Sequence, residues 1–302
     1  MLTQTTANIN IIPRYDIVPI MTLVPDLSTV SQLKAEDTNE VQAFLSVRPV
    51  HTVVMKSFIQ DNGIESELNR GKFYGYRNSS GSLDGVALIG HSTLVEARTD
   101  EALKALAFVA RTSETPIHLI MSSGNSAEDF WNYVSGGARA PRLTCTEALF
   151  EISFPFAVQN SEWSIENATM EHLLQVAEAQ AEVAFIECGV DPLVKDREGF
   201  LKRVARRIEQ GRVFTVFEND KLVFKADIIA ETDDVIYLEG IYVREEYRGR
   251  GIGSKCLASL SLELLNRVEH ICMLSNVEFE GAHKSFQKAG FMNTDHCTTL
   301  FV

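Results

Sequence analysis

Two similar hairpin patterns, one in each half of the chain, limit the fold more than any other feature. Apolar runs at 73–76 and 85–89 flank a polar, serine-rich turn, which predicts a β-hairpin. In the second half, 213–217 and 222–224 flank a turn of polar residues in the same way. The repeat of this pattern predicts a duplicated fold.

The elements around the hairpins are also repeated. Helical patterns over 37–61 and 170–209 precede the two hairpins, and strand, helix, strand and helix follow each of them. This order predicts an α/β protein made of two units, each a twisted mixed sheet flanked by helices. We therefore expect an N-terminal extension at 1–27, a first domain at 28–160 and a second at 161–302.

Composition excludes several classes of protein. At 302 residues, with 45% hydrophobic residues, the chain is long enough for two globular domains. A net charge of −13 argues against nucleic-acid binding and against attachment to an anionic membrane. The five cysteines lack metal-ligand spacing, so we expect reduced thiols, no metal and a cytoplasmic protein.

A glycine-rich loop in the second half has no counterpart in the first half. The loop 248–253, RGRGIG, follows the apolar strand 235–243 and opens an amphipathic helix. Glycines let a ligand approach the backbone, and the free N–H groups at a helix start bind anions, so this context predicts a phosphate site. The first half runs from the strand 91–98 into the helix 99–111 without such a loop, which predicts that it binds no phosphate.

Two familiar phosphate motifs fit the loop poorly. A Walker A loop ends in Gly-Lys-Ser/Thr, whereas Gly253 is followed by Ser254 and Lys255 in the reverse order. A dinucleotide fingerprint starting at Gly249 would need a third glycine where Ser254 stands. The alternative to a phosphate site is a glycine-rich surface turn whose arginines are only solvated and have no function.

The loop and its surroundings resemble the GNAT superfamily of acyl-CoA-dependent N-acyltransferases. Arg248, Gly251 and Gly253 match the family's cofactor signature of Arg or Gln, two residues, Gly, one residue, and Gly or Ala. Further along, Asn276 and Phe286 fall in a pattern of asparagine, alanine, aromatic residue and Gly-Phe that is similar to the family's later helix. The resemblance implies tandem GNAT-like domains, of which the N-terminal one is degenerate.

The resemblance also implies the ligand and its binding residues. Acetyl-CoA would be the co-substrate, with its pyrophosphate at the loop and its pantetheine arm along the preceding strand, and no metal would take part. Gly240 is a candidate for the bulge that opens this strand. The implied cofactor-binding residues are Ile241, Tyr242, Val243, Arg248, Gly249, Arg250, Gly251, Ile252, Gly253, Ser254, Asn276 and Phe286.

Proton transfer is less clear from the sequence. Glu239, on the strand beside the implied thioester, and Glu187, in the helix-loop region that lines acceptor sites in the family, are the candidate bases. Each could instead serve structure alone, Glu239 in a salt bridge and Glu187 at a helix end. Many family members have a tyrosine as general acid where Phe286 stands, so the usual acid is absent.

The function implied is an N-acetyltransferase that moves an acetyl group from acetyl-CoA to an amine by direct attack in a ternary complex. The acceptor would be a small-molecule or peptide amine, with no nucleic-acid or membrane partner, and the protein a monomer or a homodimer. A non-catalytic acyl-CoA-binding sensor or scaffold is the alternative, because Phe286 replaces the usual acid and the first half lacks a phosphate loop.

Overall fold

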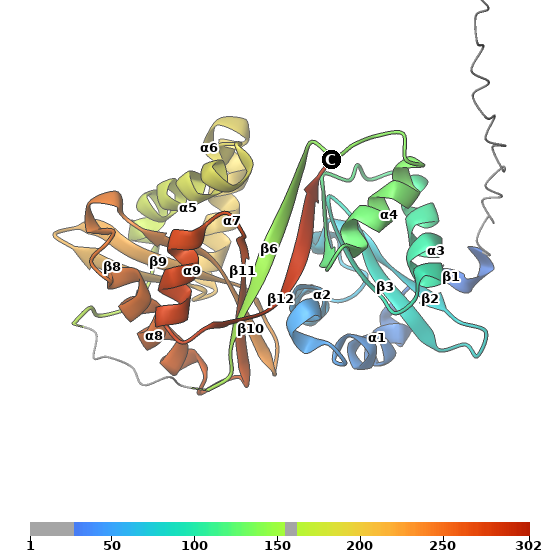
Figure 1. Cartoon of the computed structure of the whole chain (residues 1–302), viewed down its shortest axis with the longest axis horizontal. Helices are drawn as coiled ribbons and strands as arrows, with labels where there is room; N and C mark the ends of the chain where they lie inside the picture. Colours follow the sequence, from blue (N-terminus) through green and yellow to red (C-terminus); the bar gives the residue numbers. More distant parts are fainter. Residues whose placement is uncertain (1–26, 155–161) are drawn as a thin grey trace, which may run out of the picture.

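The computed structural model describes residues 27–154 and 162–302. Within them, all strands form one mixed sheet of twelve strands, with helices on both faces (Figure 1). This confirms the α/β class and the two flanked sheet units. Except for Leu27, the N-terminal extension expected at 1–27 lies outside the described residues, as does the stretch 155–161 where we expect the two domains to meet.

The first half follows the predicted order of elements. The expected hairpin forms from two antiparallel strands, β2 and β3, and the helical pattern before it divides into two helices because Pro49 begins a new one. The elements are β1 (Val30–Gln32), α1 (Thr38–Leu45), α2 (Pro49–Asn62), β2 (Gly71–Arg77), β3 (Leu83–Gly90), β4 (Ser92–Ala97), α3 (Asp100–Arg111), β5 (Leu119–Ser123), α4 (Ser126–Ser135) and β6 (Leu143–Ile152).

The second half repeats this order. Its hairpin, β8 and β9, is also confirmed, and the helical pattern before it is interrupted at Gly189 and Pro192. The elements are β7 (Glu166–Asn167), α5 (Leu173–Cys188), α6 (Pro192–Lys195), α7 (Arg197–Glu209), β8 (Val213–Glu218), β9 (Lys221–Glu231), β10 (Val235–Val243), α8 (Ile252–Leu264), β11 (His270–Asn276), α9 (Glu280–Lys288) and β12 (Met292–Phe301).

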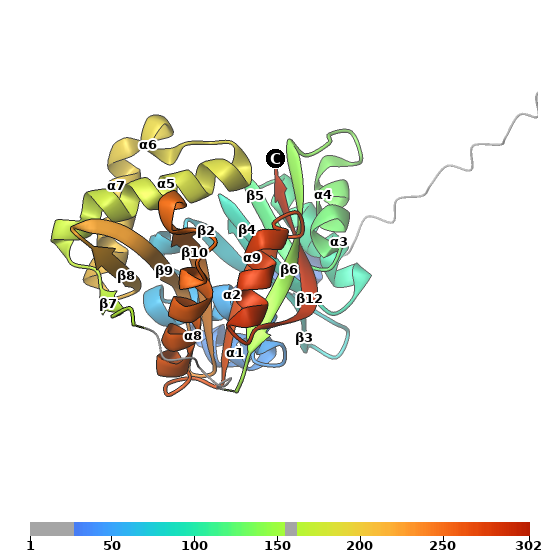
Figure 2. The ribbon, with the colours of Figure 1, turned by 60° about the vertical axis from the view of Figure 1, so that its left-hand side comes forward.

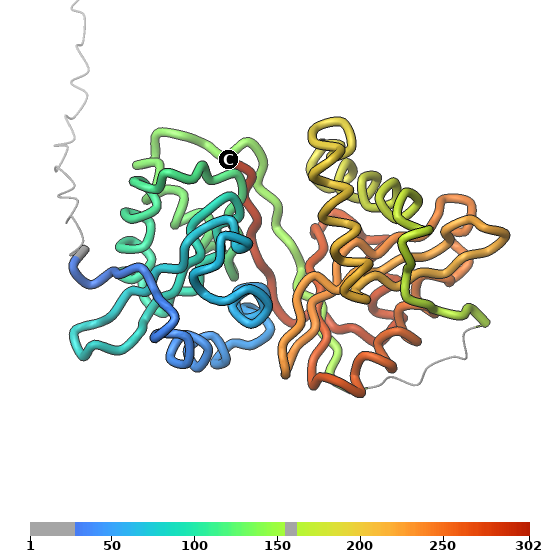
Figure 3. Tube along the Cα trace, turned by 180° about the vertical axis from the view of Figure 1, so that it is seen from behind, coloured from blue at the N-terminus to red at the C-terminus, as the bar shows by residue number. Residues whose placement is uncertain are grey.

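The last strand of each half lies beside the other half. The strand order is β1-β2-β3-β4-β5-β12-β6-β11-β10-β9-β8-β7, so β12 pairs with β5 of the first half and β6 pairs with β11 of the second. The two exchanged strands also pair with each other along their length, antiparallel. Seen from behind, they run side by side between the halves (Figure 3).

The exchange extends to the hydrophobic cores. Phe150 of β6 is buried in the core of the second half, where its ring meets Phe286 of α9 edge-on at 5.4 Å. Leu300 of β12 is fully buried in the core of the first half. Burying one such side chain contributes roughly 2 kcal/mol, so each half depends on the other's last strand for part of its core as well as for sheet pairing.

The helices form two layers on the sheet. In the turned view, α8 and α9 lie in front of the sheet and α2 behind it (Figure 2). Helix α2 belongs to the first half but also packs on the second, where Val53 joins a core cluster with Val235 and Lys56 forms an ion pair of 2.8 Å with Asp234. None of the helices within 27–154 and 162–302 is long and apolar enough to cross a membrane.

Candidate active site

Strands β10 and β11 separate at their carboxyl ends. They pair in parallel only from Val235 to Tyr237, against His270 to Cys272. Beyond this point β10 continues with β9 as far as Val243, and β11 continues with β6 as far as Asn276. The two strands therefore form a splay, with unpaired backbone on its inner sides that can hydrogen bond to a ligand.

Gly240 lies at an irregularity of β10, as expected. The register of β10 with β9 shifts between Glu239 and Tyr242, and Gly240 has a φ of +61°, which favours glycine. A Cβ atom at Gly240 would lie 2.4 Å from Oε1 of Gln180 and 2.7 Å from Nζ of Lys225. No other residue fits here without displacing these two side chains.

A completely buried lysine holds this bulge. The ammonium of Lys225 donates to the Gly240 carbonyl at 3.0 Å and to Gln180 at 2.7 Å, and it pairs with Asp227 at 2.8 Å. Asp227 also pairs with Arg207 at 3.0 Å. With two hydrogen bonds and this ion pair, Lys225 is a structural residue that fixes the backbone at the mouth of the splay.

The glycine loop has the backbone expected of an anion site. Gly249 and Gly251 both have φ of +77°, and a Cβ at either would meet nothing within 4 Å, so the space beside them is open. Helix α8 starts at Ile252, and the first helical bond there runs from Lys255 N–H to the Gly251 carbonyl. The earlier N–H groups of the turn are therefore available to a ligand at the positive end of the helix.

The loop also lies against the splay. A Cβ at Gly253 would be 3.0 Å from the Val243 side chain and 3.3 Å from the Ser285 hydroxyl, which shows how closely α8 approaches β10 and α9 here. Ser254 donates to the Gly251 carbonyl at 3.0 Å and so closes the first turn of the helix. The loop, the strand and the later helix predicted from the sequence thus meet at one place.

The two arginines of the loop have partners within the protein. Arg248 donates to the Val243 carbonyl at 2.8 Å and to Glu182 at 2.9 Å, while Arg250 lies over the ring of Tyr247. The Arg248–Glu182 pair is about half exposed on both sides, so it costs little to open. A role for Arg248 and Arg250 at a pyrophosphate stays a prediction.

Tyr242, Asn276 and Phe286 lie around the same splay. The side chain of Tyr242 is buried and donates to Glu182 at 3.2 Å, while Asn276, at the end of β11, accepts from the N–H of Glu278 at 3.0 Å. Phe286 is 6% exposed and forms part of the pocket wall. The phenyl ring at this position of α9 supplies an apolar surface and no proton.

A pocket of about 210 Å³ occupies the splay, and both candidate bases line it. We call it the splay pocket. Its walls come from α5, β10, β11 and α9, with Arg248 at one end. The lining residues are Glu182, Val183, Ile186, Glu187, Leu238, Glu239, Gly240, Ile241, Tyr242, Val243, Arg248, Met273, Leu274, Ser275, Phe279, Ala282 and Phe286.

The two predicted carboxylates have raised pKa values. Burial raises the pKa of Glu239, and Asp227 adds to this, whereas Arg207 and Lys225 act in the opposite direction. Glu187 is accessible at the pocket mouth, but the walls hold its carboxyl away from bulk water, and this desolvation raises its pKa to about 8. The charge of Glu239 raises the pKa of Glu187 as well.

A third carboxylate, Glu147, belongs to the same cluster, although it was not among the residues predicted from the sequence. It stands on the exchanged strand β6, beside Asn276 of β11, and Thr299 of β12 donates a hydrogen bond to it. Burial raises its pKa to about 7, and Glu239 contributes to the shift. Glu147 lies on the same face of β6 as the buried Leu149, and a charged residue on a buried strand face is a possible sign of a site. Only the strand exchange, however, brings Glu147 close to Glu187 and Glu239.

Glu147→Gln is expected to stabilise the protein at pH 8 by about 2 kcal/mol relative to the natural protein. The folded-state pKa of about 7 lies above the ordinary value of 4.5 for a glutamate, so the proton on Glu147 stabilises the fold at low pH, and this contribution is lost as the pH rises from 4.5 to 7. Glutamine keeps the acceptor for Thr299 and has no proton to lose. Thermal unfolding at pH 5.5 and pH 8 should therefore show a gain that is clearly larger at the higher pH.

Glu40→Gln is the control, for which we expect a change in stability at pH 8 of the opposite sign. Arg77 donates to the Glu40 carboxylate and lowers its pKa, so this variant should lose stability at pH 8. Equal changes in the melting temperature of Glu147→Gln at both pH values would contradict the raised pKa of Glu147.

The first half contains a closed counterpart of this splay. Strands β4 and β5 pair in parallel only from Ser92 to Leu94, and Glu96 follows the last pair by two residues, as Glu239 does in β10. Here Arg48 donates to Glu96 and to Ser123 of β5, both at 3.0 Å. The carboxylate is thus neutralised and the gap between the strands is bridged.

The helix after this splay offers no anion site either. Thr99 caps α3 by accepting from the N–H of Ala102, and Asp100 and Glu101 place negative charge in the first turn. The start of α3 is therefore unfavourable for an anion, in contrast to the start of α8.

Comparisons with known proteins identify the fold. A sequence model described as "Acetyltransferase (GNAT) domain" matches residues 209–293, and no curated protein sequence matches the chain. Among solved structures, an acetyltransferase of the GNAT family from Colwellia psychrerythraea is similar at a TM-score of 0.58 and 13% identity, over 90% of this chain and 98% of that one.

Two further structures match over both halves. A Drosophila protein has a TM-score of 0.64 at 13% identity, covering 91% of this chain and 98% of its own. A tandem GNAT protein from the clavulanic acid biosynthesis pathway has a TM-score of 0.55 at 12% identity, covering 90% and 97%. At such low identities these likenesses concern the fold. The chain therefore has the fold of tandem GNAT proteins, and residues 209–293 in its C-terminal half match the GNAT acetyltransferase domain.

Proposed function

We propose that the protein is an N-acetyltransferase that moves an acetyl group from acetyl-CoA to an amine by direct attack in a ternary complex. The observation that carries this proposal is the splay pocket, which is lined by Arg248 of the glycine loop and by the carboxylates Glu239 and Glu187. An anion site, a strand with free backbone groups and a proton acceptor are what this transfer needs. The match of residues 209–293 to the GNAT acetyltransferase family supports it.

The donor would lie along the loop and β10. The open N–H groups from Gly249 to Ser254 would bind the pyrophosphate, with Arg248 and Arg250 turning from their present partners to add charge. The unpaired backbone from Ile241 to Val243 would hold the pantetheine arm. This places the thioester near Glu239 at the inner end of the splay.

In the transfer, the amine nitrogen forms a bond to the thioester carbonyl carbon and the carbon–sulfur bond breaks. The proton of the amine goes to a carboxylate, and the electron pair of the broken bond leaves with the CoA sulfur. Glu239 is our first candidate for the base because it lies beside the bulge, and Glu187 is the second. A raised pKa makes either a stronger base than an ordinary carboxylate.

The CoA thiolate needs no dedicated acid from α9. A thiolate is a good leaving group, and Phe286 supplies only an apolar wall. Water, or the carboxyl that has just taken up the amine proton, can return a proton to the sulfur. The acceptor would be a small-molecule or peptide amine, which the acidic side of the splay pocket favours as a cation.

The proposal is tested by calorimetry and by thiol release. We expect acetyl-CoA to bind with a Kd in the micromolar to millimolar range usual for enzyme substrates, and a panel of amines, amino acids and peptides to release CoA thiol above the rate without acceptor. Absence of acetyl-CoA binding at millimolar concentration would overturn the proposal. Tight binding without thiol release from any acceptor would favour an acyl-CoA sensor instead.

A further inference from the structure

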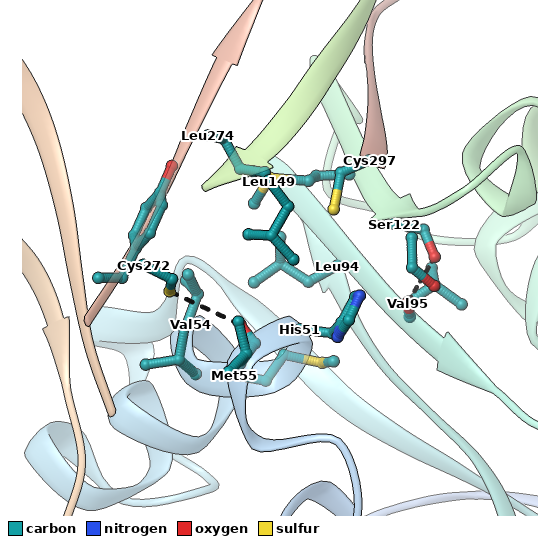
Figure 4. A pocket seen from close by; sticks show the side chains of 15 residues that line it. His51, Val54, Met55, Leu94, Val95, Ser122, Leu149, Cys272, Leu274 and Cys297 are labelled. Carbon is teal, nitrogen blue, oxygen red and sulfur yellow. Dashed lines mark hydrogen bonds between the residues drawn. The ribbon is translucent and has the colours of Figure 1, made fainter. Parts of the chain in front are cut away.

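A second pocket lies under α2, where the two halves meet. It has a volume of about 40 Å³, and we call it the seam pocket. Figure 4 shows Leu149, Leu94 and Cys297 among the side chains drawn around it, with His51 and Met55 on α2 below. Its walls therefore combine strands of both halves, including the exchanged strands β6 and β12.

The wall of the seam pocket is apolar, and several polar side chains around it have other partners. The Ser122 hydroxyl donates to the Val95 carbonyl at 2.7 Å, and the His51 ring is 2.9 Å from the Asp295 carboxylate. Cys272 and Cys297 are buried, and burial raises the pKa of the Cys297 thiol to about 12. A group that entered here would meet hydrocarbon and neutral sulfur, which favours an uncharged, apolar occupant.

The seam pocket adjoins the point at which the splay opens. Tyr237 and Cys272 line it, and they are the last paired residues of β10 and β11. Leu274 lines both the seam pocket and the splay pocket, so its side chain forms part of the wall between them. A thioester at the inner end of the splay pocket would thus have this apolar space next to its acyl carbon.

We propose that the donor site also accepts an acyl-CoA with a short aliphatic chain longer than acetyl, whose end enters the seam pocket, and binds it more tightly than acetyl-CoA. This inference rests on the donor part of the proposed function and specifies its acyl group. The bonds formed and broken are the same as for acetyl transfer. Seating the chain requires Leu274 to turn aside, a rotamer change of a kind common when ligands bind.

The size of the pocket sets the chain length. A dry apolar cavity of about 150 Å³ holds the six carbons of benzene, so 40 Å³ accommodates about one or two carbons. Since the first two carbons of the acyl group lie in the splay pocket, propionyl and butyryl chains fit, and hexanoyl and benzoyl groups exceed the space.

Calorimetric titration of the full-length protein with CoA, acetyl-, propionyl-, butyryl-, hexanoyl- and benzoyl-CoA tests the proposal without knowledge of the acceptor. Each methylene that enters the pocket should tighten binding about fourfold, from about 0.8 kcal/mol per buried methylene. Butyryl-CoA should therefore bind about 15-fold more tightly than acetyl-CoA. Hexanoyl- and benzoyl-CoA should bind no more tightly than butyryl-CoA.

Two substitutions of Cys297 change the pocket in opposite directions. Cys297→Val adds one heavy atom to the wall and should shorten the best chain by about one carbon, which lowers the preference for butyryl over acetyl about fourfold. Cys297→Ala removes one heavy atom and should lengthen the chain that binds best. Pentanoyl-CoA should therefore bind this variant more tightly than it binds the natural protein. Both variants should bind CoA itself as the natural protein does, and melting temperatures establish that both are folded.

The outcomes separate this inference from the function on which it rests. Binding of CoA with equal affinity for acetyl- and butyryl-CoA would overturn the acyl-chain proposal and leave the acetyltransferase proposal standing. Absence of binding for CoA and all of its esters would overturn the donor assignment itself. Cys297 variants that alter acceptor preference with an unchanged donor series would assign the seam pocket to the acceptor and also overturn the proposal.

Discussion

Glu239→Gln is expected to lower the rate of CoA release at saturating acceptor by about 10²–10³-fold, the usual contribution of a general base. Glutamine keeps the size of the side chain but cannot accept the proton of the attacking amine. Since Lys225 holds the bulge through the Gly240 carbonyl, the substitution should leave the backbone of the splay in place. Acetyl-CoA affinity should accordingly change little, and thiol release measured with the best acceptor of the panel gives the rate.

Glu96→Gln is the matched control, because Glu96 holds the corresponding position in the closed splay of the first half. It should leave the rate of CoA release unchanged. If Glu239→Gln kept full activity while Glu187→Gln lost it, the base would be Glu187. In that case the rate of the natural protein should rise with pH up to about 8, where Glu187 loses its proton. Full activity in both glutamine variants would exclude both candidates.

Gly251→Asp is expected to weaken acetyl-CoA binding at least about 100-fold. The new carboxylate would stand at the start of α8, where the pyrophosphate would bind, so that two negative charges compete for the same N–H groups and repel each other. A Cβ at Gly251 meets nothing within 4 Å, so the fold should tolerate the change apart from the strain of a φ of +77°. Calorimetric titration with acetyl-CoA measures the loss.

Gly136→Asp serves as the control for that strain. Gly136 has a φ of +62°, and a Cβ there also meets nothing within 4 Å, but it ends α4 in the first half. This variant should bind acetyl-CoA normally and show a similar loss of stability. If Gly251→Asp bound acetyl-CoA as tightly as Gly136→Asp, the loop at 248–253 would not be the donor site.

Local features of this fold could be predicted from the sequence because each depends on neighbouring residues. The two hairpins follow from apolar runs around polar turns, and the end of α5 and the start of α6 follow from Gly189 and Pro192. Glycines at fixed positions between a strand and a helix likewise point to the loop at α8. The order of these elements was sufficient for the fold class.

Features that depend on distant residues were not predictable in this way. The exchange of β6 and β12 leaves no local signature, since a strand of alternating pattern can pair with any suitable edge. Glu147 was missed for this reason, because only the exchange brings it near Glu187 and Glu239. The Arg48–Glu96 bridge that closes the first splay joins residues 48 positions apart.

The exchanged strands also limit which mutations this chain can tolerate during evolution. In a simple tandem array, a half without its own phosphate loop could be lost with little effect on the other. Here the first half supplies β6, which carries Glu147 and fills the core beneath α9 with Phe150. Mutations that change ligand binding in the first half should therefore be tolerated better than mutations that disrupt β6, because the splay pocket of the second half is built partly on that strand.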